Sequence, residues 1–67
     1  MELSARNQLK GKVKTVTTGA IMAEVVVDVG GHDIVAEITK GSCERLKLQK
    51  GDDVTVIVKS TEIMIGK

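Results

Sequence analysis

Runs of β-branched or small residues at every second position are the feature that most limits how this chain can fold. Period two is typical of strands with one buried face, whereas an amphipathic helix repeats its apolar residues every three or four positions. Valine, isoleucine and threonine also favour strands. These positions are Val13, Thr15, Ala23, Val25, Val27, Val29, Ile34, Ala36, Ile38, Val54, Val56 and Val58.

The runs and the glycines between them predict five strands. Gly30-Gly31 indicates a tight hairpin, because both residues tolerate positive φ. Thr18-Gly19 and Gly51-Asp52 mark two further turns. Ser42 is a candidate N-cap for a short helix over 42–48. The predicted strands lie at about 7–16, 20–29, 32–39, 53–59 and 62–66.

Five short strands and one small helix favour an all-β, OB-like five-stranded β-barrel that forms a single domain over residues 1–67. The last predicted strand has apolar residues at adjacent positions, so it needs cover on both faces, and a second subunit could supply one of them. Ordering 67 residues costs roughly 100 kcal/mol, which a core this small barely offsets. With one cysteine, Cys43, and one histidine, His32, neither an intrachain disulfide nor a zinc site of Cys and His is available. We therefore expect a homo-oligomer.

Composition excludes several classes of function. The net charge is only +1, and there is no Phe, Tyr or Trp on which nucleobases could stack, which argues against a nucleic-acid partner. No apolar run has the length of a membrane span, and Met1-Glu2-Leu3-Ser4 does not resemble a signal peptide, so we expect a cytoplasmic protein without a membrane partner. No pair of nucleophile and base and no metal-ligand set is visible, which argues against an enzyme.

Two stretches are rich in hydrogen-bond donors and contain no carboxylate. One runs from Ser4 to Gly11 and reads Ser-Ala-Arg-Asn-Gln-Leu-Lys-Gly; the other is Val58-Lys59-Ser60-Thr61. Such a set of donors suits a small anion that carries no proton. The simpler alternative is that Arg6 and Lys59 are solvated surface charges and that Ser60 and Thr61 only form a turn.

The first stretch resembles the start of the molbindins, small cytoplasmic proteins that bind molybdate and tungstate. It is similar also to the anion-sensing domains of molybdate-responsive regulators and to the accessory barrel of molybdate-transporter ATPases. The resemblance covers nearly the whole chain and continues through Ala23-Glu24-Val25-Val26-Val27, Ile38-Thr39, the helix at Ser42 and Val58-Lys59-Ser60-Thr61.

That resemblance implies an OB-like barrel in a hexamer built as a trimer of dimers, with anions held between subunits. Ser42 would reach the anion from a neighbouring subunit, with the backbone N–H of Cys43 beside it. A candidate second site is the turn Thr18-Gly19-Ala20. The anion-binding residues that the resemblance implies are Ser4, Ala5, Arg6, Thr39, Ser42, Cys43, Lys59 and Ser60.

These residues suit molybdate, a dianion whose oxygens only accept hydrogen bonds, and tungstate, which is nearly the same in size and charge. The expected function is storage or buffering of these anions. A regulatory or interaction module is the alternative, because similar barrels occur fused to ATPases and DNA-binding domains, and a nucleic-acid-binding module is less favoured.

Overall fold

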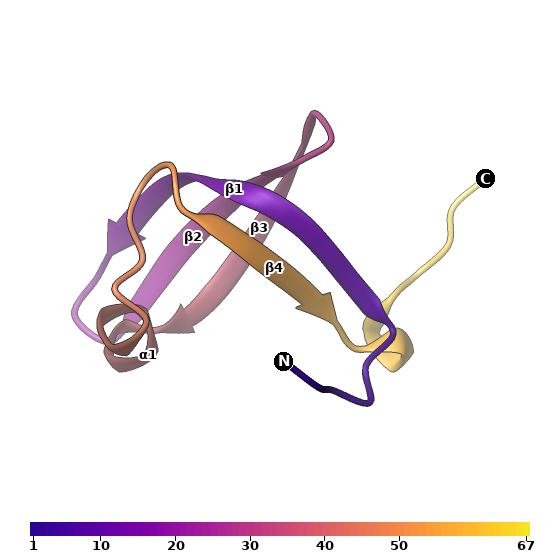
Figure 1. The fold of residues 1–67 in the computed structure, drawn as a ribbon, viewed down its shortest axis with the longest axis horizontal. Coiled ribbons are helices and arrows are strands. Elements are labelled where there is room, and N and C mark those ends of the chain that lie inside the picture. Colours follow the sequence, from indigo (N-terminus) through magenta and orange to yellow (C-terminus); the bar gives the residue numbers. More distant parts are fainter.

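The computed structural model describes residues 1–67, and four strands of the chain form one antiparallel sheet (Figure 1). Its spatial order is β3-β2-β1-β4. One short α-helix, α1 (Lys40–Arg45), follows β3, and a single 3-10 turn, η1 (Ser60–Glu62), follows β4. The mostly β architecture predicted from the alternation is therefore confirmed. The strands are β1 (Asn7–Thr18), β2 (Met22–Val29), β3 (His32–Thr39) and β4 (Asp53–Val58).

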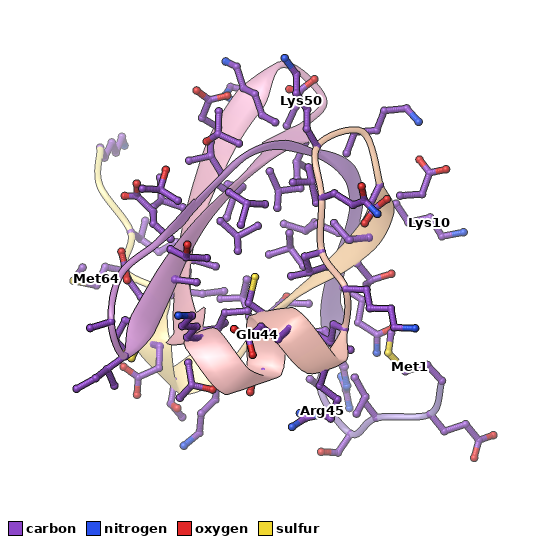
Figure 2. The ribbon with its side chains drawn as sticks, turned by 90° about the vertical axis from the view of Figure 1, so that its left-hand side faces the viewer. Met1, Lys10, Glu44, Arg45, Lys50 and Met64 are labelled. Carbon is purple, nitrogen blue, oxygen red and sulfur yellow. The ribbon has the colours of Figure 1, made fainter.

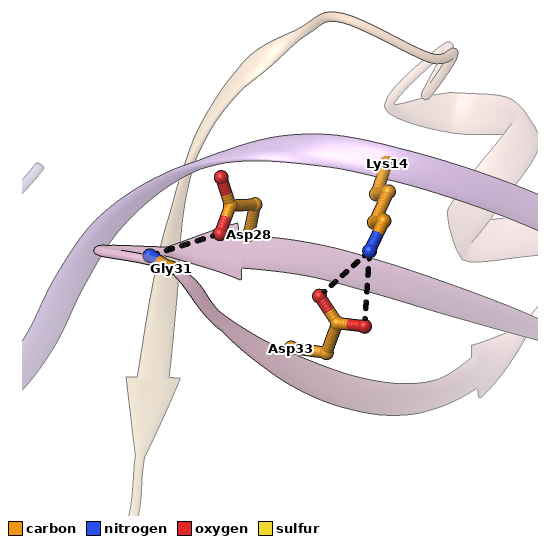
Figure 3. A network of polar contacts seen from close by, with 4 residues as sticks. All are labelled: Lys14, Asp28, Gly31 and Asp33. Carbon is orange, nitrogen blue, oxygen red and sulfur yellow. Dashed lines mark hydrogen bonds and ion pairs between the residues drawn. The ribbon is translucent and has the colours of Figure 1, made fainter.

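The β2–β3 hairpin turns at Gly30-Gly31, as the sequence predicts. Both glycines have positive φ, 56° and 89°, which a residue with a Cβ rarely adopts. The Asp28 carboxylate accepts a hydrogen bond of 3.1 Å from the Gly31 N–H and so holds the turn (Figure 3). The register that follows pairs Val29 with His32 and runs without a break to Met22 opposite Thr39.

Strand β1 is the longest and pairs with two partners. Its first half pairs with β4, and its second half pairs with β2. A register shift between Val13 and Thr15 interrupts the β1–β2 ladder, and such bulges bend a strand and increase its twist. Gly11 lies at the crossing, where a Cβ would come within 2.5 Å of the Asp28 carbonyl oxygen, so only glycine fits this close approach.

The core is a small valine cluster on the concave face of this curved sheet. Val13, Val25 and Val27 are almost fully buried, and half-buried residues of β1 to β4 and Leu48 pack around them. Side chains fill the space that the sheet encloses, and α1 lies across one of its ends (Figure 2). Only 5 of the 67 residues are buried, so the isolated chain leaves much of its apolar surface in water.

Three sequence-based expectations differ from what the single chain shows. Residues 62–66 form no strand within the single chain: Glu62 is the last residue of η1, and the residues after it pair with none of the four strands. The sheet is open within one chain, since β3 and β4 are its free edges. The helix begins at Lys40 rather than after Ser42, and Thr39 is its N-cap. Neither helix is long and apolar enough to cross a bilayer.

Candidate anion-binding site

The two donor-rich stretches meet at one end of the molecule. Asn7 pairs with Val58 at the end of the β1–β4 ladder, so the residues before β1 lie beside those after β4 (Figure 1). Between them is an open hollow of about 520 Å³. Its lining residues are Ser4, Ala5, Arg6, Asn7, Lys59 and Ser60.

Local hydrogen bonds fold both segments back toward the hollow. On the N-terminal side, the Gln8 side-chain amide donates to the Ala5 carbonyl at 2.6 Å, and the Gln8 N–H donates to the Arg6 carbonyl at 3.1 Å. On the other side, the Glu62 N–H donates to the Lys59 carbonyl at 2.9 Å and forms the turn of η1. The bend before β1 is therefore held by Gln8, a role that no motif in the sequence indicates.

The charge of this hollow is positive and uncompensated. Arg6 and Lys59 are exposed and belong to neither of the two ion pairs in the chain. One pair joins Lys12 to Asp53, and the other joins Lys14 to Asp33 (Figure 3). No carboxylate lines the hollow. A guanidinium, an ammonium, serine hydroxyls and an asparagine amide together offer many donors, and such a set favours an oxyanion.

The other expected anion-binding residues, Thr39 and, from a neighbouring subunit, Ser42 and Cys43, lie at the opposite end of the sheet. The Thr39 hydroxyl oxygen accepts from the Ser42 N–H at 3.1 Å, and the same hydroxyl donates to the Ser42 side-chain oxygen at 2.8 Å. Cys43 is buried, and only 4% of its surface is exposed. Since α1 and η1 mark the two ends of the molecule, one chain does not bring Thr39, Ser42 and Cys43 to Arg6 and Lys59 (Figure 1).

The candidate second site lies beside this helix. Thr18 ends β1, and Gly19, Ala20 and Ile21 connect it to β2. The Gly19 N–H donates to the Met22 carbonyl at 2.7 Å, and the Ile21 carbonyl accepts from the Lys40 N–H at 2.7 Å, which joins the turn to the first residue of α1. The predicted residues thus form two groups, one at each end of the sheet.

A larger hollow, of about 600 Å³, has the wrong chemistry for an anion. Lys10 and Lys12 share it with Asp28 and Asp53, and the Lys12 ammonium lies 2.8 Å from the Asp53 carboxylate. Its charges therefore compensate one another. The hollow that Arg6 and Lys59 line is smaller, but it alone combines unpaired cations with hydroxyl donors and no carboxylate.

The comparisons with known proteins point to one family. The TOBE domain family model matches residues 3–65. Molybdenum-pterin-binding protein 1 of Clostridium pasteurianum is 47% identical over 66 residues, which are 97% of either chain. A structure of a molybdate-binding protein from Sporomusa ovata is 43% identical over the full length of both chains, with a TM-score of 0.95.

A longer relative has been solved with its ligand. The cytoplasmic molybdate-binding protein ModG, with molybdate bound, is 41% identical, with a TM-score of 0.84, over 90% of this chain and 43% of its own. The likeness to these structures identifies the four strands and the short helix as the OB-like fold of these proteins. The chain therefore belongs to the TOBE domain family, and it is a binding protein of the molbindin type rather than an enzyme.

Proposed function

We propose that this protein binds molybdate in the hollow between Arg6 and Lys59, and that it stores or buffers this anion in the cytoplasm. The proposal rests on one observation. The Arg6 guanidinium and the Lys59 ammonium, neither of which forms an ion pair within the chain, line the same hollow, and no carboxylate lines it. The names of its relatives support the choice of anion.

The chemistry of the lining explains why molybdate is favoured over phosphate. Arg6 and Lys59 offset the two negative charges, and each charge-assisted hydrogen bond contributes about 1.5–3 kcal/mol. The hydroxyls of Ser4 and Ser60 can rotate to donate. Phosphate carries a proton at neutral pH, and in this hollow only the neutral oxygens of Ser4, Asn7 and Ser60 could accept it, because no carboxylate is present. Tungstate has the same charge and nearly the same size, so we propose that it binds with similar affinity.

A complete site needs a second copy of the chain. The hollow is open to water on one side, and the remaining expected contacts, Thr39, Ser42 and the backbone of Cys43, lie at the far end of the same chain. A neighbouring copy whose helix end meets the hollow would supply them. We therefore propose a homo-oligomer, a hexamer built as a trimer of dimers, with anions between its subunits.

The C-terminal segment supports self-association of this kind. Ile63, Met64 and Ile65 follow η1 with 45%, 92% and 91% of their surfaces exposed, and Met64 projects away from the sheet (Figure 2). Between the free edges β3 and β4 lies a groove of about 240 Å³, and nine of its ten lining residues are hydrophobic. We propose that this segment of a second copy fills the groove as a fifth strand.

Native mass spectrometry and thermal unfolding test the proposal together. The protein, freed of bound ions, is titrated with molybdate, tungstate, sulfate and phosphate at equal ionic strength. We expect one oligomer with a fixed number of molybdate or tungstate ions. A ligand at a hundredfold its Kd stabilises the bound form by about 2.7 kcal/mol, so the Tm should rise by several degrees. A monomer that takes up no anion, with an unchanged Tm at millimolar molybdate, would refute the proposal.

A further inference from the structure

The residues that line the anion hollow differ in how firmly the fold holds them. Arg6 and Lys59 are exposed and have long, flexible side chains. Their charged groups can therefore move to contact anions of different sizes. Ser4 and Ser60 are exposed and lie outside the strands. Asn7 is half-buried, is the first residue of β1 and is held by the ladder opposite Val58. It is the only polar lining residue that a strand anchors.

The side chain of Asn7 is available for a ligand. Asn7, Gly11 and Val13 are separated by even numbers of residues, which puts Asn7 on the same, core-facing side of β1 as the buried Val13. Its amide makes no hydrogen bond within the chain, whereas the amide of its neighbour Gln8 donates to the Ala5 carbonyl. A half-buried amide with two donor hydrogens and no partner, in the wall of a cationic hollow, is suited to an oxyanion.

We propose that Asn7 is the specificity-determining residue of the hollow: its side-chain amide donates to the bound oxyanion and selects large tetrahedral oxyanions over sulfate. This inference rests on the proposed function. Sulfate has the same charge and the same acceptors as molybdate, so flexible cations cannot distinguish the two. A donor on a short side chain whose backbone a strand anchors can, because the shorter bonds of sulfate leave its oxygens too far away for a well-aligned hydrogen bond.

Lengthening this side chain by one methylene is the sharpest test. Asn7→Gln keeps the amide but moves it roughly 1.5 Å further into the hollow, the length of one carbon–carbon bond. The dissociation constants for molybdate and sulfate are measured by titration calorimetry on the 67-residue protein. We expect weaker binding of molybdate and equal or tighter binding of sulfate, so that the preference for molybdate falls at least about tenfold, which corresponds to about 1.4 kcal/mol.

Further variants separate contact from folding. Asn7→Leu keeps a similar side-chain volume but has no hydrogen-bond donor, and Asn7→Ser has a shorter side chain whose donor lies further from the anion. Both variants should weaken molybdate binding more than sulfate binding. If Asn7→Leu fails to fold, Asn7→Ser tests the same point. Gln49→Leu removes an exposed amide in the loop before β4, outside the hollow, and should leave the preference unchanged.

The outcomes distinguish this inference from the proposed function. Equal loss of affinity for both anions in the Asn7 variants would mean that Asn7 only supports the fold, and it would overturn the inference while leaving molybdate binding intact. A wild-type protein that binds sulfate as tightly as molybdate would overturn it as well. A wild-type protein that binds neither anion would instead refute the proposed function.

Discussion

Asn7 lies directly opposite Val58 in the β1–β4 ladder, and this one pair places Arg6 and Lys59 beside the same hollow. Both cations immediately flank the pair, Arg6 before Asn7 and Lys59 after Val58, and neither lies in a strand. Shifting the register by one residue would turn the side chains of one strand to the opposite face. The site therefore depends on the register of the sheet as much as on its own residues.

Replacement of Arg6 by alanine should weaken molybdate binding by at least tenfold. The guanidinium has no partner in the chain and lines the hollow, and a charge-assisted hydrogen bond contributes about 1.5–3 kcal/mol, or roughly tenfold to a hundredfold in affinity. Titration calorimetry measures the change. The matched control is Lys14→Ala, which removes the same charge from an ion pair of 3.2 Å with Asp33 outside the hollow. Equal losses from both variants would refute the assignment of Arg6.

Gly11→Ala should destabilise the fold by about 1–3 kcal/mol or more, as overpacking of a core does. A Cβ at Gly11 would lie 2.5 Å from the Asp28 carbonyl oxygen and 2.7 Å from a methyl group of Val27, and the backbone atom cannot move without shifting β2. Urea unfolding monitored by circular dichroism measures the effect. In α1, a Cβ at Gly41 meets nothing within 4 Å, so Gly41→Ala should leave the stability equal or slightly higher. Similar results for both glycines would contradict this account of β1.

The sequence allowed the strands to be predicted because each has a period-two pattern that one buried face imposes. It did not allow the last segment to be predicted correctly. Adjacent apolar residues such as Ile63 and Met64 indicate burial, but they do not say which surface buries them, and no strand of the same chain does. Arg6 and Lys59 could be named as candidates from their motifs. Their convergence depends on the register of β1 and β4, and the role of Asn7 depends on which residues the sheet anchors; spacing along the chain reveals neither.

The facing pair Glu24 and Glu37 predicts a stabilising substitution. These exposed residues are directly opposite in the β2–β3 ladder, and like charges in this position destabilise a sheet. Glu37→Lys should raise the free energy of unfolding by about 0.2–1 kcal/mol, less at high salt. The double variant Glu24→Lys/Glu37→Lys restores a like-charged pair and should return the stability toward that of the wild type. A double variant as stable as Glu37→Lys alone would exclude the pairwise explanation.

Lys12 should titrate at a higher pH than an unpaired lysine. Its ammonium donates a hydrogen bond of 2.8 Å to the Asp53 carboxylate, and this bond, with the attraction of the opposite charge, raises the pKa of Lys12 above 10.5. The stabilisation from the pair is present below the unfolded pKa and is lost as the pH rises through the higher folded pKa. Both side chains are largely exposed, so the contribution to stability is small.

Nuclear magnetic resonance of the lysine side chains can follow this titration directly. Asp53→Asn should lower the midpoint of Lys12, because it removes both the charge and much of the hydrogen bond. Asp33→Asn removes a carboxylate that pairs with Lys14 instead, and it should not change the Lys12 midpoint. A Lys12 midpoint that is the same in wild type and Asp53→Asn would show that the pair does not persist in solution.

A charge in the C-terminal segment should dissociate the proposed oligomer without unfolding the chain. Ile65 is 91% exposed in the single chain, so Ile65→Asp removes little contact within it, yet in the proposed oligomer it would place a carboxylate in the apolar groove of a second copy. Burying an unpaired charge is strongly unfavourable, and sedimentation velocity should show smaller species. Val35→Asp adds the same charge at another exposed apolar position, outside the groove, and should leave the assembly intact. If molybdate sites lie between subunits, Ile65→Asp should also weaken molybdate binding, although Ile65 lies outside the hollow. An Ile65→Asp variant that forms the same oligomer and binds molybdate with unchanged affinity would show that the C-terminal segment does not occupy the groove of a second copy.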